Sequence, residues 1–207
     1  MLHCSAGCWR SWGHEWGASV SGVHPGPLDD VRPPAEYEPD RASSRSRLAE
    51  HRRDRRIALG DLVSLVIEDR ETLRGALEEA LRSERVEAAS QVEAERRVVA
   101  TALPGADELC ALLVLEIADP AELGGRLREL RQLPAGLHLE VDGVMTAPAV
   151  DAADAEGSVH LLRFHLPGGG AAVRRAAEVT VRLDHPSYRA RARLTPAQRE
   201  ALAASVG

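Results

Sequence analysis

The stretch Ile57-Ala-Leu-Gly-Asp-Leu-Val-Ser-Leu-Val-Ile67 predicts a β-hairpin. Gly60 and Asp61 are residues typical of a tight turn, and they separate two runs rich in β-branched and aliphatic side chains. The apolar residues alternate with the others along each run, so one face of the hairpin is apolar. These inward-facing residues are Ile57, Leu59, Val63, Leu65 and Ile67. The hairpin therefore predicts an antiparallel sheet that buries one face.

Helices and further strands follow from the same patterns on both sides of this hairpin. The Pro-rich segment from Leu28 to Asp40 is expected to be extended, and a helix should follow it to about Arg55. Asp69 can cap a long helix, continuous or interrupted, that reaches about Val99, and Asp119-Pro-Ala-Glu122 starts another helix. Apolar runs at 108–117, 137–150, 158–166 and 179–183 predict strands, and Asp142-Gly143 is a strong type I′ hairpin signal. The last helix should start at Thr195-Pro-Ala-Gln198.

These elements predict an α+β fold, with a largely antiparallel sheet and helices packed on one face. Residues 28–207 form a single domain in this interpretation. Residues 1–27 differ in composition, since they hold all three Trp and two of the three Cys, and they are expected to be a disordered, dispensable extension. Nothing in this extension resembles a signal peptide, and no apolar run approaches a membrane span, so we expect a cytoplasmic protein.

The basic residues are unusual because all 26 are Arg. The absence of Lys excludes Schiff-base chemistry and the phosphate-binding loop that depends on a Lys. Two stretches, 41–56 and 174–199, carry seven Arg each, whereas the region between them is acidic. Such asymmetry can mark an anion-binding face or simply a solvated surface, and the pI of 5.8 makes nucleic acid an improbable partner. The candidate anion-binding residues are Arg55, Arg56, Arg82 and Arg85.

Two histidines are the candidate metal ligands. Strand alternation places His160 and His185 with the apolar side chains of their strands, where an imidazole needs a polar partner. If the two strands are neighbours, these histidines could bind a transition metal together with Glu68 or Glu84. The alternative is that each imidazole donates a hydrogen bond that orders the core, and in that case no cofactor is predicted. Cys110 lies in an apolar strand, where a nucleophilic thiolate is disfavoured, and the domain lacks the clustered Cys of an iron–sulfur protein.

Three groups of residues together resemble one family. They are Arg55-Arg-Ile-Ala-Leu-Gly with Ile67-Glu-Asp-Arg-Glu-Thr72, Leu81-Arg-Ser-Glu-Arg85, and Ser158-Val-His-Leu-Leu-Arg-Phe164 with Asp184-His-Pro-Ser-Tyr188. In this combination the chain resembles the bacterial domain of unknown function 3501 family, from about Leu28 to its C-terminus. The family usually has an aromatic residue where this chain has Gly75, Gln at Ala76 and Met at Ala80, so this helix departs from the pattern.

The resemblance implies a setting rather than a reaction. Members of the family are found beside genes for an iron–sulfur oxidoreductase and a rubrerythrin-like protein, which implies a role in redox or peroxide defence. The expected function is that of a non-catalytic accessory or binding protein with one of these as its partner. The alternative is a metal-dependent enzyme that uses His160 and His185.

Overall fold

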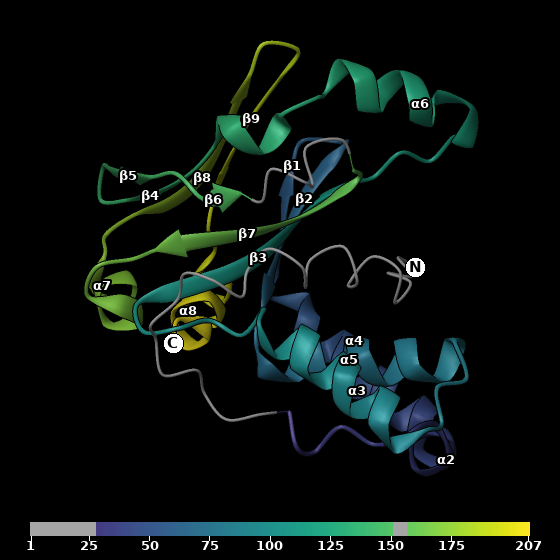
Figure 1. The fold of residues 1–207 in the computed structure, drawn as a ribbon. Helices are drawn as coiled ribbons and strands as arrows, with labels where there is room; N and C mark the ends of the chain where they lie inside the picture. Colours follow the sequence, from purple (N-terminus) through teal and green to yellow (C-terminus); the bar gives the residue numbers. More distant parts are fainter. Residues whose placement is uncertain (1–27, 151–156) are drawn as a thin grey trace. The chain divides into compact units, whose positions relative to one another are not determined.

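The computed structural model describes residues 28–150 and 157–207, which are coloured in Figure 1. The predicted N-terminal extension lies outside the described residues. The described chain forms two compact units. The helical unit runs to Arg53 and resumes over Glu68–Gly105, and the sheet unit comprises Asp54–Ile67 and Ala106–Gly207. The expectation of a single folding domain over residues 28–207 stays a prediction.

The helical unit is built from short and medium helices around an aliphatic centre. Their bounds are α2 Pro34–Tyr37, η2 Glu38–Asp40, α3 Arg41–Arg53, α4 Arg70–Ser83 and α5 Ala89–Ala100. The prediction of an extended segment over residues 28–40 was wrong in its second half. Pro34 and Pro39 lie in the first turns of α2 and η2. A backbone N–H at these positions has no acceptor within the helix, so proline loses no helical hydrogen bond there.

The predicted long helix is divided into α4 and α5. Asp69 caps α4 as expected, because its side chain accepts from the Thr72 backbone N–H while the Thr72 hydroxyl accepts from the Asp69 N–H. The helix ends beyond Ser83, where Arg85 takes a left-handed conformation with φ 55°. The Val86 N–H then bonds back to the Leu81 carbonyl, which satisfies a terminal acceptor.

The sheet unit holds two antiparallel sheets. The predicted antiparallel α+β class is therefore confirmed, but the strands are divided between two sheets instead of forming one. One has the strand order β1-β2-β3-β7-β6 and the other the order β5-β4-β8-β9. The bounds of the first sheet are β1 Arg56–Leu59, β2 Val63–Glu68, β3 Glu108–Leu115, β6 Ala149–Val150 and β7 Val159–His165. Those of the second are β4 Leu137–Val141, β5 Val144–Thr146, β8 Val179–His185 and β9 Tyr188–Arg193. The helical segments of this unit are α6 Pro120–Glu129, η3 Leu133–Gly136, α7 Gly169–Arg175 and α8 Pro196–Ser205.

One aliphatic core joins the two sheets and the helices α7 and α8. The hairpin residues that the alternation places inward, such as Leu59, Leu65 and Ile67, are all buried in it. Phe164, the single Phe of the chain, is fully buried among aliphatic side chains. The burial of apolar surface is the main stabilising term here, because this core has almost no aromatic contribution.

Tyr188 fixes the first hairpin to the last strand. Its hydroxyl donates to the Leu59 carbonyl at 2.6 Å and accepts from the Leu62 N–H at 3.2 Å. Gly60, with φ 73°, lies directly against this hydroxyl, and a side chain there would collide with it. The segment Asp184-His-Pro-Ser-Tyr188 contains the tight turn between β8 and β9.

Candidate functional site

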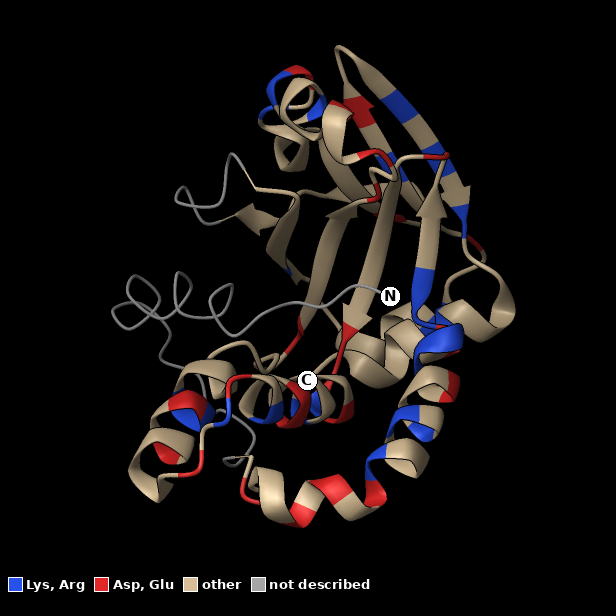
Figure 2. Ribbon diagram, turned by 90° about the vertical axis from the view of Figure 1, so that its right-hand side faces the viewer, with Lys and Arg blue, Asp and Glu red and all other residues tan. Residues whose placement is uncertain are grey.

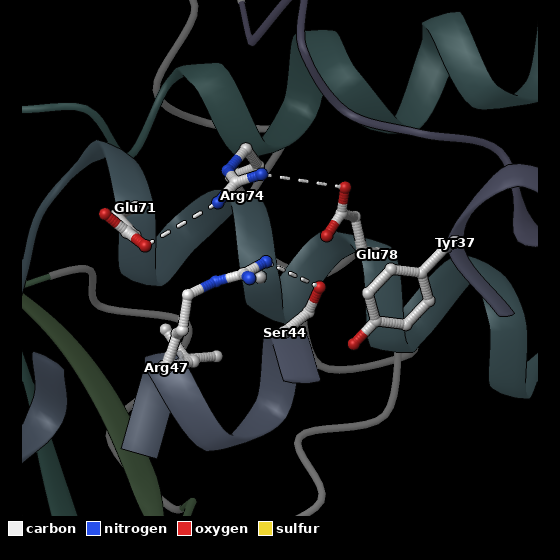
Figure 3. Close-up of a pocket in the computed structure, with 8 residues that line it drawn as sticks. Tyr37, Ser44, Arg47, Glu71, Arg74 and Glu78 are labelled. Carbon is white, nitrogen blue, oxygen red and sulfur yellow. Dashed lines mark hydrogen bonds and ion pairs between the residues drawn. The ribbon is translucent and has the colours of Figure 1, made fainter. Parts of the chain in front are cut away.

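A hollow in the helical unit lies between α3 and α4. Its lining comes from one side of each helix and from Tyr37 of α2, and its interior volume of about 10 Å³ has room for about one water molecule. Figure 3 shows the labelled residues around it, with Ser44 and Arg47 projecting from α3 and Glu71, Arg74 and Glu78 from α4. Pockets that enclose drug-sized ligands are far larger, about 300–1,000 Å³.

The helices α3 and α4 approach closely at Gly75, and this contact forms the floor of the hollow. A Cβ atom at residue 75 would lie only 2.6 Å from Leu48 Cδ2. A larger side chain at this position would need the space that Leu48 fills. Gly75 therefore permits close packing of Leu48 on the α4 backbone.

Glu78 is the most buried charge of the site and is neutralised by Arg32. The Glu78 side chain is 1% exposed, and Arg32 holds both of its oxygens, with Nε at 2.8 Å and Nη2 at 3.1 Å. The Arg32 backbone N–H adds a third bond at 3.2 Å. A carboxylate this deep is tolerated only with such complete pairing. Arg32 also lies over the Tyr37 ring, 5.0 Å from its centroid, which adds a cation–π contact.

Glu79, the next residue of α4, has its own partners. It accepts from Arg41 at 2.9 and 3.0 Å and from the Tyr37 hydroxyl at 2.7 Å. Burial acts to raise the pKa of Glu79, but the bonds from Arg41 and Tyr37 outweigh it and hold the pKa below its usual value. Burial together with the bond to Glu79 raises the pKa of the Tyr37 hydroxyl well above its usual value, so Tyr37 stays protonated.

Arg47 and Arg74 differ from these paired groups. Arg47 donates to the Ser44 hydroxyl at 3.3 Å and has no carboxylate within ion-pairing distance among the described residues. Arg74 lies between three carboxylates, those of Asp30, Glu71 and Glu78, at 3.6, 3.7 and 3.9 Å. These are ion pairs without a hydrogen bond, since each distance exceeds that of an N–H···O bond.

The sequence prediction did not single out Arg32, Arg47 or Arg74. Arg47 lies within the basic stretch 41–56 that the charge pattern does mark, whereas the other two lie outside it. Helical spacing is the signal that could have found Arg74, because residues 71, 74, 75 and 78 share one face of a helix.

The four predicted anion-binding arginines are divided between the two units. Arg55 and Arg56 belong to the sheet unit, and Arg82 and Arg85 to the helical unit. Arg56 pairs with Glu116, whose carboxylate also accepts from Ser64 at 2.7 Å. Arg82 pairs with Glu38 of η2. These contacts show that Arg56 and Arg82 each face a carboxylate of their own unit.

The predicted metal ligands lie on separate elements. His160 is buried on β7 and His185 ends β8, and these strands belong to different sheets. His185 Nε2 donates to the Arg131 carbonyl at 3.0 Å, while its Nδ1 accepts from the Ser187 N–H at 3.2 Å, so both ring nitrogens are engaged. Glu68 is buried at the end of β2, and Glu84 is exposed after α4. Within the described residues, no group of three or more His, Cys, Asp or Glu side chains is arranged to hold a metal.

Cys110 has more polar surroundings than the strand pattern predicts. Arg163, opposite it on β7, is nearly buried and donates to the Cys110 sulfur at 3.3 Å and to Glu108 at 3.3 Å. Arg163 points away from the face that holds His160, Leu162 and Phe164. Strand alternation along β7 was the available signal, because it places Arg163 on the face opposite to the apolar residues.

Three arginines of the second basic stretch lie on the outer side of β9. Arg189, Arg191 and Arg193 alternate with smaller residues and are exposed, and Figure 2 shows the basic positions recurring along this strand. Glu178 lies 3.9 Å from Arg191 and 3.7 Å from Arg193. Exposed arginine on an outer strand also discourages edge-to-edge aggregation, which agrees with the interpretation as a solvated surface.

Comparison with known proteins gives the chain its family. The family model described as protein of unknown function (DUF3501) matches residues 27–206. The chain belongs to this family. A DUF3501 assignment names no reaction, and the search of curated proteins gives no match.

The fold of this DUF3501 chain also occurs in a solved structure. A crystal structure of a novel protein of unknown function from Burkholderia pseudomallei is similar with a TM-score of 0.79 and 24% identity. The similarity covers 86% of this chain and 97% of that one. At this identity the match shows a shared fold. None of the helices described in this chain is both long and apolar enough to cross a membrane.

Proposed function

We propose that this protein is a non-catalytic accessory protein that binds a redox partner through the β4–β5 hairpin. The observation that carries the proposal is the exposure of Val144 and Met145, whose side chains are 69% and 54% accessible. Neighbouring residues of a strand point to opposite faces, so the hairpin presents an apolar side chain on each face. Exposed apolar side chains on both faces of an end strand are available to a partner that packs against this hairpin.

The position of this hairpin supports the same proposal. β5 is an end strand of its sheet, and it is joined to β4 by the tight turn at Asp142-Gly143. An end strand has unpaired backbone groups along its outer edge, which a partner strand or loop can use. The tight turn holds the hairpin in one conformation, which lowers the entropy cost of binding.

Family membership supplies the nature of the partner in this proposal. The genomic setting implied for the family points to an iron–sulfur oxidoreductase or a rubrerythrin-like protein, in the cytoplasm. We therefore expect an interaction in which this chain positions or stabilises a redox protein and performs no chemistry of its own.

The test is an affinity purification of the tagged full chain from its native host, at native expression, with quantitative mass spectrometry. The wild type should enrich an iron–sulfur oxidoreductase or a rubrerythrin-like protein, and the double variant Val144→Ser, Met145→Ser should lose most of it. Leu123→Ser is the matched control, because Leu123 is also an exposed apolar residue, on α6, and should leave the enrichment unchanged.

Two results would contradict the proposal. If the wild type recovers neither redox protein, this chain does not bind the proposed partner. If the Leu123→Ser control loses as much enrichment as the double variant, the hairpin is not the binding surface. Melting curves of all variants would show that each remains folded.

A further inference from the structure

Met145 carries the accessible sulfur of the part of the chain that the structure describes. The sequence has two Met and three Cys, and of these Met145 and Cys110 are the two that lie within residues 28–150 and 157–207. Cys110 is fully buried, whereas Met145 is 54% exposed. An oxidant in solution can therefore reach the Met145 thioether, while the Cys110 thiol is shielded from it.

The position of Met145 in the sheet lets its chemistry change without loss of the fold. Met145 of β5, an end strand in Figure 1, lies directly opposite Glu140 of β4. The next pair along the hairpin is Thr146 opposite Leu139, which is buried in the core. Residues directly opposite each other share a face of the sheet, and successive residues alternate between the faces. Met145 therefore lies on the face away from the core, where a polar group on its sulfur stays in water and costs the folded state little.

Hydrogen peroxide converts such a thioether into a sulfoxide in one step. A lone pair of the sulfur attacks one peroxide oxygen, the O–O bond breaks and an S–O bond forms. The proton of the transferred oxygen passes to the departing hydroxide, so water is released. The sulfur loses two electrons and the peroxide gains them. Methionine sulfoxide reductases return the polar product to the thioether, so the modification is reversible.

We propose that Met145 is a reversible oxidation site at which hydrogen peroxide releases the partner of the β4–β5 hairpin. This inference rests on the proposed function, in which Val144 and Met145 are the exposed apolar residues of that hairpin. A partner that covers the thioether would also have to cover the sulfoxide oxygen, and burying an acceptor without a donor is unfavourable. We therefore expect the sulfoxide form to bind the partner about tenfold more weakly than the thioether form.

The first experiment tests the oxidation site without any partner. The purified full chain is treated with hydrogen peroxide, cleaved with trypsin and analysed by mass spectrometry. Cleavage after Arg131 and Arg163 places Met145 in a peptide that has no other sulfur, and Cys110 in a separate peptide. Met145 should gain one oxygen atom in the folded chain, while Cys110 stays unmodified and the melting temperature stays unchanged. Oxidation of Met145 only in the unfolded chain, or a fall in melting temperature on oxidation, would overturn the proposal.

The second experiment measures how oxidation changes partner binding. The full chain is oxidised, freed from peroxide and used to capture the redox protein that the purification from the native host identifies. The readout is the ratio of the amount captured after oxidation to the amount captured before it. This ratio should be about one tenth for the wild type and should return to one after treatment with methionine sulfoxide reductase. It should stay at one in Met145→Leu, because the hairpin then has no thioether and any effect of leucine on binding itself cancels in the ratio.

The double variant Met145→Leu, Leu123→Met is the matched control. It moves the thioether from the hairpin to α6, where Leu123 is 39% exposed. Peroxide should oxidise this variant and leave its ratio at one. The proposal is overturned if the wild-type ratio stays at one, or if Met145→Leu loses as much capture on oxidation as the wild type does. Failure of the proposed function is a separate result, because the untreated wild type then captures neither redox protein and both proposals fall.

Discussion

The charged residues of α4 show how one helix can carry ion pairs with and without hydrogen bonds. Glu78 and Glu79 are neighbours in sequence and point in different directions, so each finds its own arginine, Arg32 and Arg41. Both pairs are partly shielded from solvent, where each hydrogen bond to a charged group stabilises the folded state. Arg74 lies one turn earlier and is left with ion pairs that contain no hydrogen bond.

Glu79 gives a prediction for acid stability. Its folded pKa lies below the ordinary value of 4.5, so the unfolded chain takes up a proton first as the pH falls. The stabilisation by Glu79 is therefore fully present above about pH 5 and is lost as the pH drops through the folded pKa. Glu79→Gln should lower the melting temperature at neutral pH and flatten its decline below about pH 4.5, measured by circular dichroism.

Glu87→Gln serves as the control for this measurement. Glu87 is exposed after α4 and makes no hydrogen bond or ion pair among the described residues. Its replacement should leave unchanged both the melting temperature at neutral pH and its decline at acid pH. If the melting temperature falls with decreasing pH at the same slope in the wild type and in Glu79→Gln, the role assigned to the Arg41 and Tyr37 bonds is contradicted.

His160 and His185 give a prediction that separates a structural role from metal binding. Elemental analysis of protein purified without chelator should find no stoichiometric transition metal. His185→Ala should lower the free energy of unfolding by about 0.5–1.5 kcal/mol, because the Arg131 carbonyl and the Ser187 N–H each exchange a protein partner for water. One equivalent of metal in the wild type that disappears in His160→Ala and His185→Ala would instead establish the metal-dependent alternative.

At the scale of elements, two glycines show the difference between a packing position and an open one. Gly170 of α7 lies so close to α8 that a Cβ atom there would come within 2.0 Å of the Ala203 carbonyl oxygen. Gly125 of α6 has no neighbour within 4 Å of the same hypothetical atom. Both are helical, so their intrinsic preferences for the helix are equal.

Alanine at these two positions should have opposite effects. Gly170→Ala must push α7 from α8 and should cost about 1–3 kcal/mol or more, as overpacking does. Gly125→Ala should raise the stability by as much as about 1 kcal/mol, since alanine has the higher helix propensity. Urea unfolding of the two variants measures both values, and a neutral Gly170→Ala would show that the two helices are not packed as described.

At the scale of the whole molecule, the chain passes between the helical and sheet units three times, after Arg53, Ile67 and Gly105. Each passage ties the formation of one unit to the other, because the helical unit is made from two separate chain segments. We therefore expect a single cooperative transition in differential scanning calorimetry, with equal calorimetric and van't Hoff enthalpies. Two resolved transitions would show that the units unfold separately and would contradict the single domain predicted from the sequence.

The sequence predicted most elements where local signals agree with one another. The Gly60 hairpin, the caps at Asp69, Asp119 and Thr195, and the Asp142-Gly143 turn all formed as expected, because turn and cap preferences act within a few residues. β9 was missed, since its outward positions are all Arg and its inward ones mostly Ala, so its alternation carries little hydrophobic contrast.

The residue composition and local pattern by themselves determined the antiparallel α+β class, the aliphatic core and the family resemblance. Only the tertiary structure decided that the strands divide into two sheets, that His160 and His185 lie in different ones, and that Ser44, Arg47 and Arg74 face a common hollow. The physical reason is the distance along the chain over which each interaction acts. Caps, turns and alternation depend on neighbours along the chain, whereas the meeting of side chains from α3 and α4 depends on how closely two helices pack at Gly75, which no local pattern encodes.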